Sequence, residues 1–209
     1  ITDDIAKRDF TINAIAIPLN SKIVESLKDT GFPQTCPREN GDNCGNDKKS
    51  ILKFIDPCSG VRDLKKHYIR VVSSQVFNDD PLRMIRAVRI AGELNFSISK
   101  NTENLIKKQS SLIKGVSQER IRDELFRILT FENSNLYIKK LDELKLLDKV
   151  ISGIDIMKGV EQPGYHHLDV WGHSLETVKF LDKILEEIKK ISPMQLIEIE
   201  KYLSGEPVK

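Results

Sequence analysis

The sequence predicts an α+β fold in which a short mixed sheet precedes a part built only of helices. Two observations support this fold class. Ile-rich segments of strand length, separated by turn residues, gather in residues 1–73. From Asn78 onward, Leu, Ile and Val recur at every third or fourth position, which is the period of one helix face.

The composition is that of a folded, helix-rich protein. Charged residues make up 31% of the 209 residues and the chain has only 8 Pro and 11 Gly, so a disordered chain is not expected. The 33 basic and 31 acidic residues leave a net charge of +2, which by itself does not indicate nucleic-acid binding. Any basic surface must therefore come from local clustering.

Cysteine usage and hydropathy predict a cytoplasmic protein without a membrane partner. Cys36, Cys44 and Cys58 are an odd number at spacings unlike paired C-x-x-C motifs, which argues against a disulfide framework and a structural zinc site. No apolar run is long enough to cross a bilayer, and the first residues lack the regions of a signal peptide.

Short strands are predicted on both sides of an inserted loop. Thr11–Pro18 and Ser50–Ile55 are strand candidates that we interpret as a hairpin, and Gly31–Lys49 between them has the composition of an exposed loop. The turn residues Asp56–Gly60 lead to a further strand candidate, Tyr68–Val72.

A helix is predicted over Pro81–Leu94, with Asp79 or Asp80 as its cap. Proline suits the first turn of a helix because its missing N–H has no partner there. The apolar face of this helix comprises Leu82, Ile85, Val88 and Ala91. Further helices are predicted over residues 102–113, 117–130, 136–144 and 170–187, with a domain boundary near residue 155.

Arg8–Ala14 places polar groups at the entry to a predicted strand. Arg8 offers several donors to a phosphate, and Asn13 can both donate to and accept from a sugar hydroxyl. A charged turn at the surface is the alternative, and spacing does not choose between the two interpretations.

One carboxylate and three guanidiniums share a face of the predicted helix: Asp80, Arg83, Arg86 and Arg89. An aspartate and an arginine one turn apart can meet the Watson–Crick edge of a base, and the other arginines can neutralise a triphosphate. The alternative is a solvated face held by intrahelical pairs such as Arg89 with Glu93, and helix spacing leaves both open.

Two further clusters are interpreted as structural. Ser117–Leu125 carries Glu119, Arg120 and Glu124, as in a helix that braces the preceding one. Gln162–His173 contains three of the four histidines and an aspartate, but no His-Asp dipeptide follows it. We interpret it as a hydrogen-bonded corner that begins a helix, and we expect no metal site in the chain.

In this order, the four clusters resemble motifs of the tRNA nucleotidyltransferases (CCA-adding enzymes) and bacterial poly(A) polymerases, the class II branch of the polymerase β-like nucleotidyltransferases. Arg8–Ala14 resembles R-D-F-T-I-N-A, and Asp79–Arg83 resembles the base-reading motif E-D-x-x-R with Asp in place of Glu. The remaining matches are to E-R-x-x-x-E and to a head-to-neck connection: Glu119, Arg120 and Glu124 for the first, and Asp56-Pro57, Gly60, Asp63-Leu64 and Ile69-Arg70-Val71 for the second.

The resemblance implies the downstream part of a longer enzyme. Residues 1–73 would be the C-terminal part of a polymerase β-like nucleotidyltransferase head, and residues 74–155 a helical neck for base recognition and RNA binding. Residues 156–209 would begin a helical body, which resembles a truncated HD-like domain that ends before its His-Asp dyad.

The resemblance also implies roles for individual residues. Asp80 and Arg83 would read the incoming base as a protein template. The other nucleotide-binding residues are Arg8, Arg86 and Arg89, which would hold the nucleotide, and Asp9 and Asn13, which would shape the pocket around its sugar. Five lysines on the neck helices either contact RNA phosphates or form a solvated face: Lys107, Lys108, Lys114, Lys139 and Lys140.

Catalysis in the family uses metal-binding carboxylates in a D-x-D pair upstream of R-D-F. This chain has no two aspartates separated by one residue, so the Mg²⁺ ligands are expected upstream and the chain alone is expected to be inactive. The implied substrates are ATP, with CTP as a second candidate, and the 3′ end of tRNA or another RNA. CCA, CC-only, A-only and poly(A) addition share these motifs, and a non-catalytic nucleotide- and RNA-binding module remains the alternative.

Overall fold

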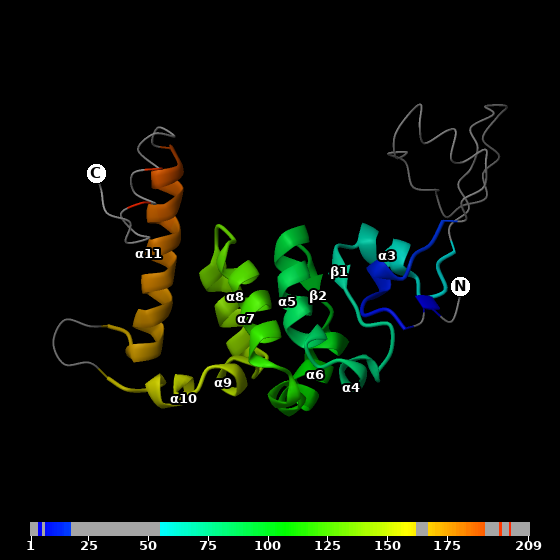
Figure 1. The fold of residues 1–209 in the computed structure, drawn as a ribbon, viewed down its shortest axis with the longest axis horizontal. Helices are drawn as coiled ribbons and strands as arrows, with labels where there is room; N and C mark the ends of the chain where they lie inside the picture. Colours follow the sequence, from blue (N-terminus) through cyan, green and yellow to red (C-terminus); the bar gives the residue numbers. More distant parts are fainter. Residues whose placement is uncertain are drawn as a thin grey trace.

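The computed structural model describes residues 4–5, 7–17, 55–161, 167–190, 197 and 201. Helices dominate these ranges, and none of the helices in them is long and apolar enough to span a membrane. The elements form a row from α11 through α8 and α5 to α3 and the N-terminal segment (Figure 1). Their bounds are η1 Thr11–Asn13, α3 Gly60–Lys65, β1 Tyr68–Ile69, α4 Val76–Asp79, α5 Arg83–Leu94, β2 Ser97–Ile98, α6 Lys100–Gln109, η2 Ser110–Gly115, α7 Gln118–Leu129, α8 Ser134–Glu143, α9 Leu147–Val150, α10 Ile154–Met157 and α11 Val170–Lys190.

The sheet in the described ranges is small and parallel. β1 pairs with β2, with Tyr68 opposite Ser97 and Ile69 opposite Ile98, and the chain between them forms α4 and α5. The predicted strand Tyr68–Val72 is therefore confirmed in its first half, whereas β2 was not predicted. Two isolated antiparallel bridges, Phe10 with Val71 and Ala16 with Ile55, attach the N-terminal segment.

The prediction of a strand over Thr11–Pro18 is wrong for its first three residues, whereas the antiparallel pairing predicted with Ser50–Ile55 is present at Ala16 and Ile55. Thr11–Asn13 forms a 3₁₀ helix, and Ala16 alone bridges toward the second strand candidate. The Thr11 Oγ1 donates a 2.8 Å hydrogen bond to Asp63 Oδ2, and the Thr11 N–H donates to the Arg70 carbonyl at 2.9 Å. These tertiary contacts outweigh the local preference of β-branched residues for strands. Gly31–Lys49 and most of Ser50–Ile55 lie outside the described residues.

Helix α5 confirms the predicted helix from Arg83 to Leu94. Pro81 and Leu82 form the turn before it, in which Arg83 N donates to Asp80 O at 3.1 Å. Asn95 ends the helix in the left-handed conformation. The predicted apolar face is buried: Leu82, Ile85, Val88 and Ala91 are at most 5% exposed.

The other predicted helices are present with shifted ends. The helix predicted over residues 102–113 is α6, which continues as the 3₁₀ helix η2, and the next two are α7 and α8. The last is α11, whose Asp182 is buried and accepts hydrogen bonds from Ser134 Oγ at 3.0 and 3.1 Å. This contact attaches α11 to the N-terminus of α8. The short helices α3, α4, α9 and α10 were not predicted.

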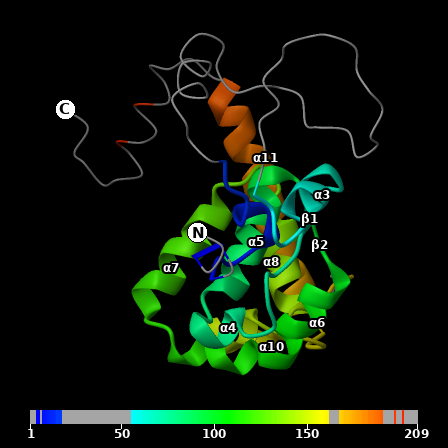
Figure 2. The ribbon, with the colours of Figure 1, turned by 90° about the vertical axis from the view of Figure 1, so that its right-hand side faces the viewer.

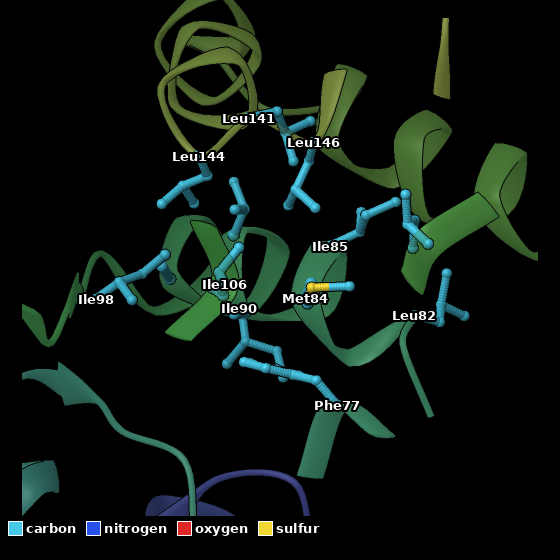
Figure 3. Packing of buried hydrophobic residues seen from close by; sticks show 14 of the residues in the cluster. Phe77, Leu82, Met84, Ile85, Ile90, Ile98, Ile106, Leu141, Leu144 and Leu146 are labelled. Atoms are coloured by element: carbon cyan, nitrogen blue, oxygen red, sulfur yellow. The ribbon is translucent and has the colours of Figure 1, made fainter. Parts of the chain in front are cut away.

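An apolar core of the described residues includes the buried face of α5 (Figure 3). It joins α5 to both strands, to α4 and α6, and to the loop between α8 and α9. Its fully buried members include Ile69, Phe77, Met84, Ile85, Ile106, Leu141, Leu144 and Leu146. Burial of each such side chain stabilises the fold by about 1.5–3 kcal/mol. The core therefore fixes the position of α5, which begins with the predicted base-reading residue Arg83 and directly follows the turn that carries Asp80.

Candidate functional site

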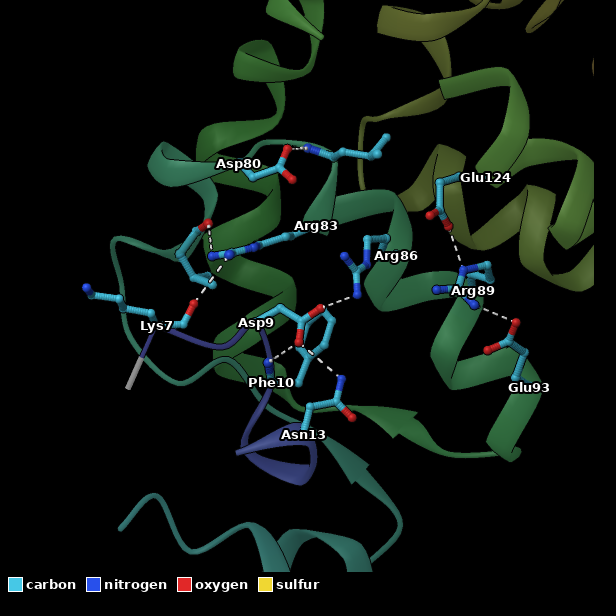
Figure 4. A network of polar contacts seen from close by, with 12 residues as sticks. Lys7, Asp9, Phe10, Asn13, Asp80, Arg83, Arg86, Arg89, Glu93 and Glu124 are labelled. Carbon is cyan, nitrogen blue, oxygen red and sulfur yellow. Dashed lines mark hydrogen bonds and ion pairs between the residues drawn. The ribbon is translucent and has the colours of Figure 1, made fainter. Parts of the chain in front are cut away.

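The start of α5 contacts the N-terminal segment through two arginines (Figure 4). Arg83 donates from Nη2 to the carbonyl of Lys7 and from Nη1 to the carbonyl of Val76, both at 3.3 Å. One turn further along, Arg86 Nη2 lies 2.7 Å from Asp9 Oδ2. The first and second predicted motifs therefore meet, although they are far apart in sequence. Figure 2, viewed from the side of the N-terminal segment, shows that segment in front of α5.

Asp9 is a buried carboxylate with several partners. Its Oδ1 accepts hydrogen bonds from Phe10 N at 3.0 Å and from Asn13 Nδ2 at 3.1 Å. Its Oδ2 forms the ion pair with Arg86. The Nε of Arg86 is buried and has no hydrogen-bond partner in the described part of the chain. Asp9, Asn13 and Arg86 thus form one polar cluster, in which Arg86 keeps an unused donor.

The segment that carries Asp9 is held from behind by a second buried carboxylate. Asp63 is fully buried, and its Oδ2 accepts from Thr11 Oγ1 and from Arg70 Nε at 2.9 Å. Gly60 lies so close to the segment that a Cβ there would be 2.0 Å from the Thr11 carbonyl oxygen. Gly60 is the first residue of α3, and the Asp56 side chain caps this helix by accepting hydrogen bonds from the backbone N–H of Gly60 and of Val61. α3 therefore fixes the position of the N-terminal segment that carries Asp9.

Asp80 lies in the extended residue between α4 and α5. Its Oδ1 accepts from Leu82 N at 3.2 Å within the turn before α5. The predicted helix cap is therefore wrong in position, because α5 begins at Arg83 and its N-cap residue is Leu82, which makes no side-chain cap hydrogen bond. Its Oδ2 lies 2.8 Å from Nη2 of Arg120, which projects from α7. The Asp80 side chain is 24% exposed. The Arg120 contact was not predicted, because it joins two separate motifs that lie 40 residues apart in the sequence.

Arg89 lies further along α5 in a buried ionic cluster. It donates from Nε to Glu124 Oε2 of α7 and from Nη1 to Glu93 Oε1, both at 2.5 Å. Burial by itself would lower the pKa of Arg89, but the hydrogen bond to Glu93 and the charge of Glu124 outweigh it and raise the pKa. The Arg89–Glu93 pair is the alternative that helix spacing left open. We name Arg89, Glu93 and Glu124 the brace.

Two of the predicted residues lie apart from the Asp9 cluster. Arg8 is 57% exposed and pairs with Asp4 at 3.3 Å. Arg89 is 9% exposed and engaged in the brace. The nucleotide contacts predicted for these two arginines remain predictions. Glu119 is exposed on α7.

Asp169 organises the corner before α11. Its two carboxylate oxygens accept from the backbone N–H groups of Gly159 and Gly172, each at 2.7 Å, and these hydrogen bonds lower its pKa. His166 lies outside the described residues. Within the described ranges, no three His, Cys, Asp or Glu side chains gather where they could hold a metal ion.

The predicted basic residues divide into exposed and paired lysines. Lys140 of α8 donates to Glu103 of α6 at 2.5 Å, so its charge is partly neutralised. The other four are exposed: Lys107, Lys108, Lys114 and Lys139.

Comparison with known proteins is consistent with the motifs. The family described as the probable RNA and SrmB-binding site of polymerase A matches residues 95–157. An A-adding tRNA nucleotidyltransferase from Deinococcus radiodurans is 30% identical over 183 residues, which are 85% of this chain and 35% of the relative. A CC-adding tRNA nucleotidyltransferase from Geobacter sulfurreducens is 36% identical over 141 residues, which are 68% of this chain and 26% of the relative.

Among solved structures, a tRNA-processing enzyme with CTP is 31% identical to this chain. The similarity covers 73% of this chain and 35% of that structure, with a TM-score of 0.54. The chain thus spans about a third or less of the length of the curated relatives it matches.

Proposed function

Because this chain belongs to the family of tRNA nucleotidyltransferases and bacterial poly(A) polymerases, we propose that it selects nucleotides for template-independent addition of AMP or CMP to RNA 3′ ends. The RNA is tRNA in this proposal, and the substrates are ATP and CTP. The observation that carries the proposal is the junction of Arg83 and Arg86 with the segment from Lys7 to Asp9. It joins a base-reading helix to a cluster suited to a sugar and phosphates.

Base selection follows from the hydrogen-bonding character of Asp80 and Arg83. A carboxylate only accepts hydrogen bonds, so Asp80 suits the exocyclic amino group of adenine or cytosine. Guanine and uracil carry a carbonyl oxygen at the corresponding position, and a carboxylate repels it. Arg83 only donates, so it suits a ring nitrogen acceptor next to that amino group. One carboxylate and one guanidinium therefore select adenine and cytosine together.

The present contacts of these two residues leave them available to a base. Among the described residues, each Asp80 oxygen has one hydrogen-bond partner, and a carboxylate oxygen can accept a second hydrogen bond. Arg83 is held by two hydrogen bonds of 3.3 Å, a length at the weak end of the usual range. A base can replace these long contacts at little cost. We name Asp80 and Arg83 the reading end of α5.

The Asp9 cluster is the proposed place for the sugar and phosphates. Asn13 and Asp9 offer an amide and a carboxylate to sugar hydroxyls, and Arg86 adds positive charge and an unused donor. Arg8 is exposed at the edge of the same segment, where its guanidinium can pair with a phosphate.

RNA binding is proposed for the helices that follow α5. Residues 95–157 match a probable RNA-binding family and carry the four exposed lysines, and phosphate contacts by lysine supply affinity without sequence selectivity. In this proposal residues 1–73 belong to the nucleotidyltransferase head, 74–155 to the neck, and 156–209 to the start of the body. The metal-binding carboxylates are assigned to residues outside this chain.

The proposal is tested by incorporation of labelled ATP and CTP, with Mg²⁺, into tRNA that lacks its 3′ end. The 209 residues are compared with the chain extended through its upstream coding sequence. We expect incorporation only by the extended chain. Incorporation by the 209 residues would contradict the assignment of the metal ligands. Inactivity of both proteins would favour a non-catalytic nucleotide- and RNA-binding module.

Base selection is tested in the extended chain with Asp80→Ala and Arg83→Ala. Loss of a bidentate contact should reduce discrimination of ATP from GTP by about 1–3 kcal/mol, which is roughly 5- to 150-fold. Asp123→Ala is the control, because Asp123 is 62% exposed on α7 and pairs with Arg122. Unchanged selectivity in both reading-end variants would exclude this assignment.

A further inference from the structure

Helix α7 contacts the reading end as well as the brace, and the two contacts differ in kind. Glu124 binds the buried Arg89, whereas Arg120 binds Asp80, the proposed base-reading carboxylate. We propose that Arg120 is a positioning residue that sets the orientation of Asp80 and thereby the selectivity for the base. This inference rests on the proposed function of Asp80.

Asp80 is held at two points that come from different parts of the fold. Oδ1 is fixed by Leu82 N within the same turn, at 3.2 Å. Oδ2 is fixed by Arg120 Nη2 at 2.8 Å, from a residue 40 positions later. One anchor on each oxygen defines the plane of a carboxylate, whereas the local anchor alone leaves it free to turn. Arg120 therefore supplies the second constraint that a directional hydrogen bond to a base requires.

The exposure of the pair favours positioning over blocking. The Arg120 side chain is 53% exposed and Asp80 is 24% exposed, and ion pairs of this kind contribute at most about a fivefold factor to an equilibrium. Such a contact is too weak to exclude a nucleotide from Asp80. It is strong enough to bias the orientation of one carboxylate, and the second lone pair of each oxygen stays available to an amino group.

Arg120 should therefore affect discrimination between bases and not the affinity that all nucleotides share. The triphosphate and sugar are common to ATP and GTP, and to CTP and UTP. The ratio of dissociation constants within each pair removes the shared contribution. Arg120→Ala should lower the GTP/ATP and UTP/CTP ratios by about fivefold, the upper end for an exposed ion pair.

The experiment is calorimetric titration of the chain with each of the four nucleoside triphosphates. Arg122→Ala is the matched control: Arg122 lies on the same helix, is 57% exposed and pairs with the adjacent Asp123 instead of Asp80. Arg120→Lys should restore part of the selectivity, because lysine keeps the charge but lacks the planar fork of donors. Thermal unfolding of each variant identifies any loss of fold.

Salt supplies a readout that a purely structural role would not change. Exposed ion pairs are screened as the ionic strength rises from about 0.05 M to about 0.5 M. The two ratios of the natural sequence should fall toward those of Arg120→Ala, whereas the ratios of Arg120→Ala itself should stay constant. Screening of the triphosphate cancels within each ratio.

The outcomes separate this inference from the proposed function. If Asp80→Ala lowers the ratios but Arg120→Ala behaves like Arg122→Ala, the positioning role is wrong and the base-reading role of Asp80 stands. If Arg120→Ala tightens binding of all four nucleotides, Arg120 blocks the site and the inference is overturned. If Asp80→Ala leaves the ratios unchanged, or if no nucleotide binds, the proposed function fails and the inference fails with it.

Discussion

The two ends of α5 carry the same types of side chain in different environments. At the reading end, Asp80 and Arg83 are partly exposed and are held by an exposed arginine and by two long hydrogen bonds. In the brace, Arg89 is 9% exposed and has two carboxylate partners at 2.5 Å. Buried ionic contacts are costly to break and difficult to exchange, whereas exposed ones exchange readily.

The difference shows that burial, and not helical spacing, determines which of these charged residues can exchange their contacts and which are fixed. Asp80, Arg83, Arg86 and Arg89 recur every three residues, yet the contacts change from exchangeable to fixed within two turns of helix. A helix that binds a base needs both kinds of contact. The side chains that contact the base must exchange their hydrogen bonds, while the helix backbone keeps its position. Substitutions that change one kind of contact alone can therefore separate reading from support.

The largest effect is expected where the support behind the Asp9 segment is tightest. Gly60→Ala places a Cβ 2.0 Å from the Thr11 carbonyl oxygen, and a backbone atom cannot turn aside as a side chain does. We expect a loss of about 3 kcal/mol or more in the free energy of unfolding, measured by urea denaturation. Gly115→Ala is the control, because nothing lies within 4 Å of its added Cβ. Equal stability of the two variants would show that the backbone at Thr11 can shift away from the added Cβ without loss of stability, and would contradict this prediction.

The next effect is expected in the brace. Glu124→Ala leaves a buried arginine with one of its two carboxylates, so we expect the free energy of unfolding to fall by about 2–3 kcal/mol. Glu93→Ala removes the more exposed partner and should cost about 1 kcal/mol or less. Asp80→Ala, at the reading end, should also cost about 1 kcal/mol or less while it changes base selection. A loss at Asp80 as large as that at Glu124 would remove the distinction between the two ends.

The smallest effect is expected from a pair of intermediate exposure. Glu103 is 12% exposed and Lys140 is 32% exposed, and their ion pair joins α6 to α8. Burial by itself would raise the pKa of Glu103, but the hydrogen bond and charge of Lys140 outweigh it and lower the pKa. The folded protein therefore binds this proton less tightly than the unfolded chain. The pair stabilises the fold above the unfolded pKa, and the stabilisation is lost as the pH falls through the folded pKa.

Glu103→Gln should accordingly reduce the free energy of unfolding by about 0.5–1 kcal/mol at neutral pH, and the difference from the natural sequence should shrink below about pH 4. Glu143→Gln is the control, since Glu143 is 50% exposed and lies 3.7 Å from the same lysine. Denaturation curves across this pH range measure both variants. A difference that persists unchanged in acid would contradict the role of the Glu103 charge.

The sequence was sufficient to predict elements whose contacts are local. The apolar period of α5 and the turn before it, in which Asp80 accepts from Leu82 N, depend on neighbours within a few residues, and both are present. The order of the motifs also identified the family. The 3₁₀ turn at Thr11 was not predictable in this way, because its hydroxyl partner is Asp63, 52 residues away.

The contacts that distinguish the two ends of α5 also lie beyond the range of a local pattern. Arg89 meets Glu124 across 35 residues, and Asp80 meets Arg120 across 40. Glu124 and Arg120 both belong to the Ser117–Leu125 cluster, which the sequence indicates only as a supporting helix. The spacing of Arg120 and Glu124, one turn apart on α7, was a signal that one helix can contact two separate sites: Asp80 before α5, and Arg89 on α5.

The parallel pairing of β1 with β2 has a consequence for how the chain folds. The strands are separated only by α4 and α5, so the unit from Tyr68 to Ile98 closes over a short stretch of chain. Short loops close at a lower entropic cost than long ones, and contacts close in sequence form early. We expect α5 to be set by its own flanking strands first, before α7 brings Arg120 and Glu124 to it. In this order of folding, the unit that contains α5 forms first, and α7 then packs against it and brings the side chains that orient Asp80 and hold Arg89.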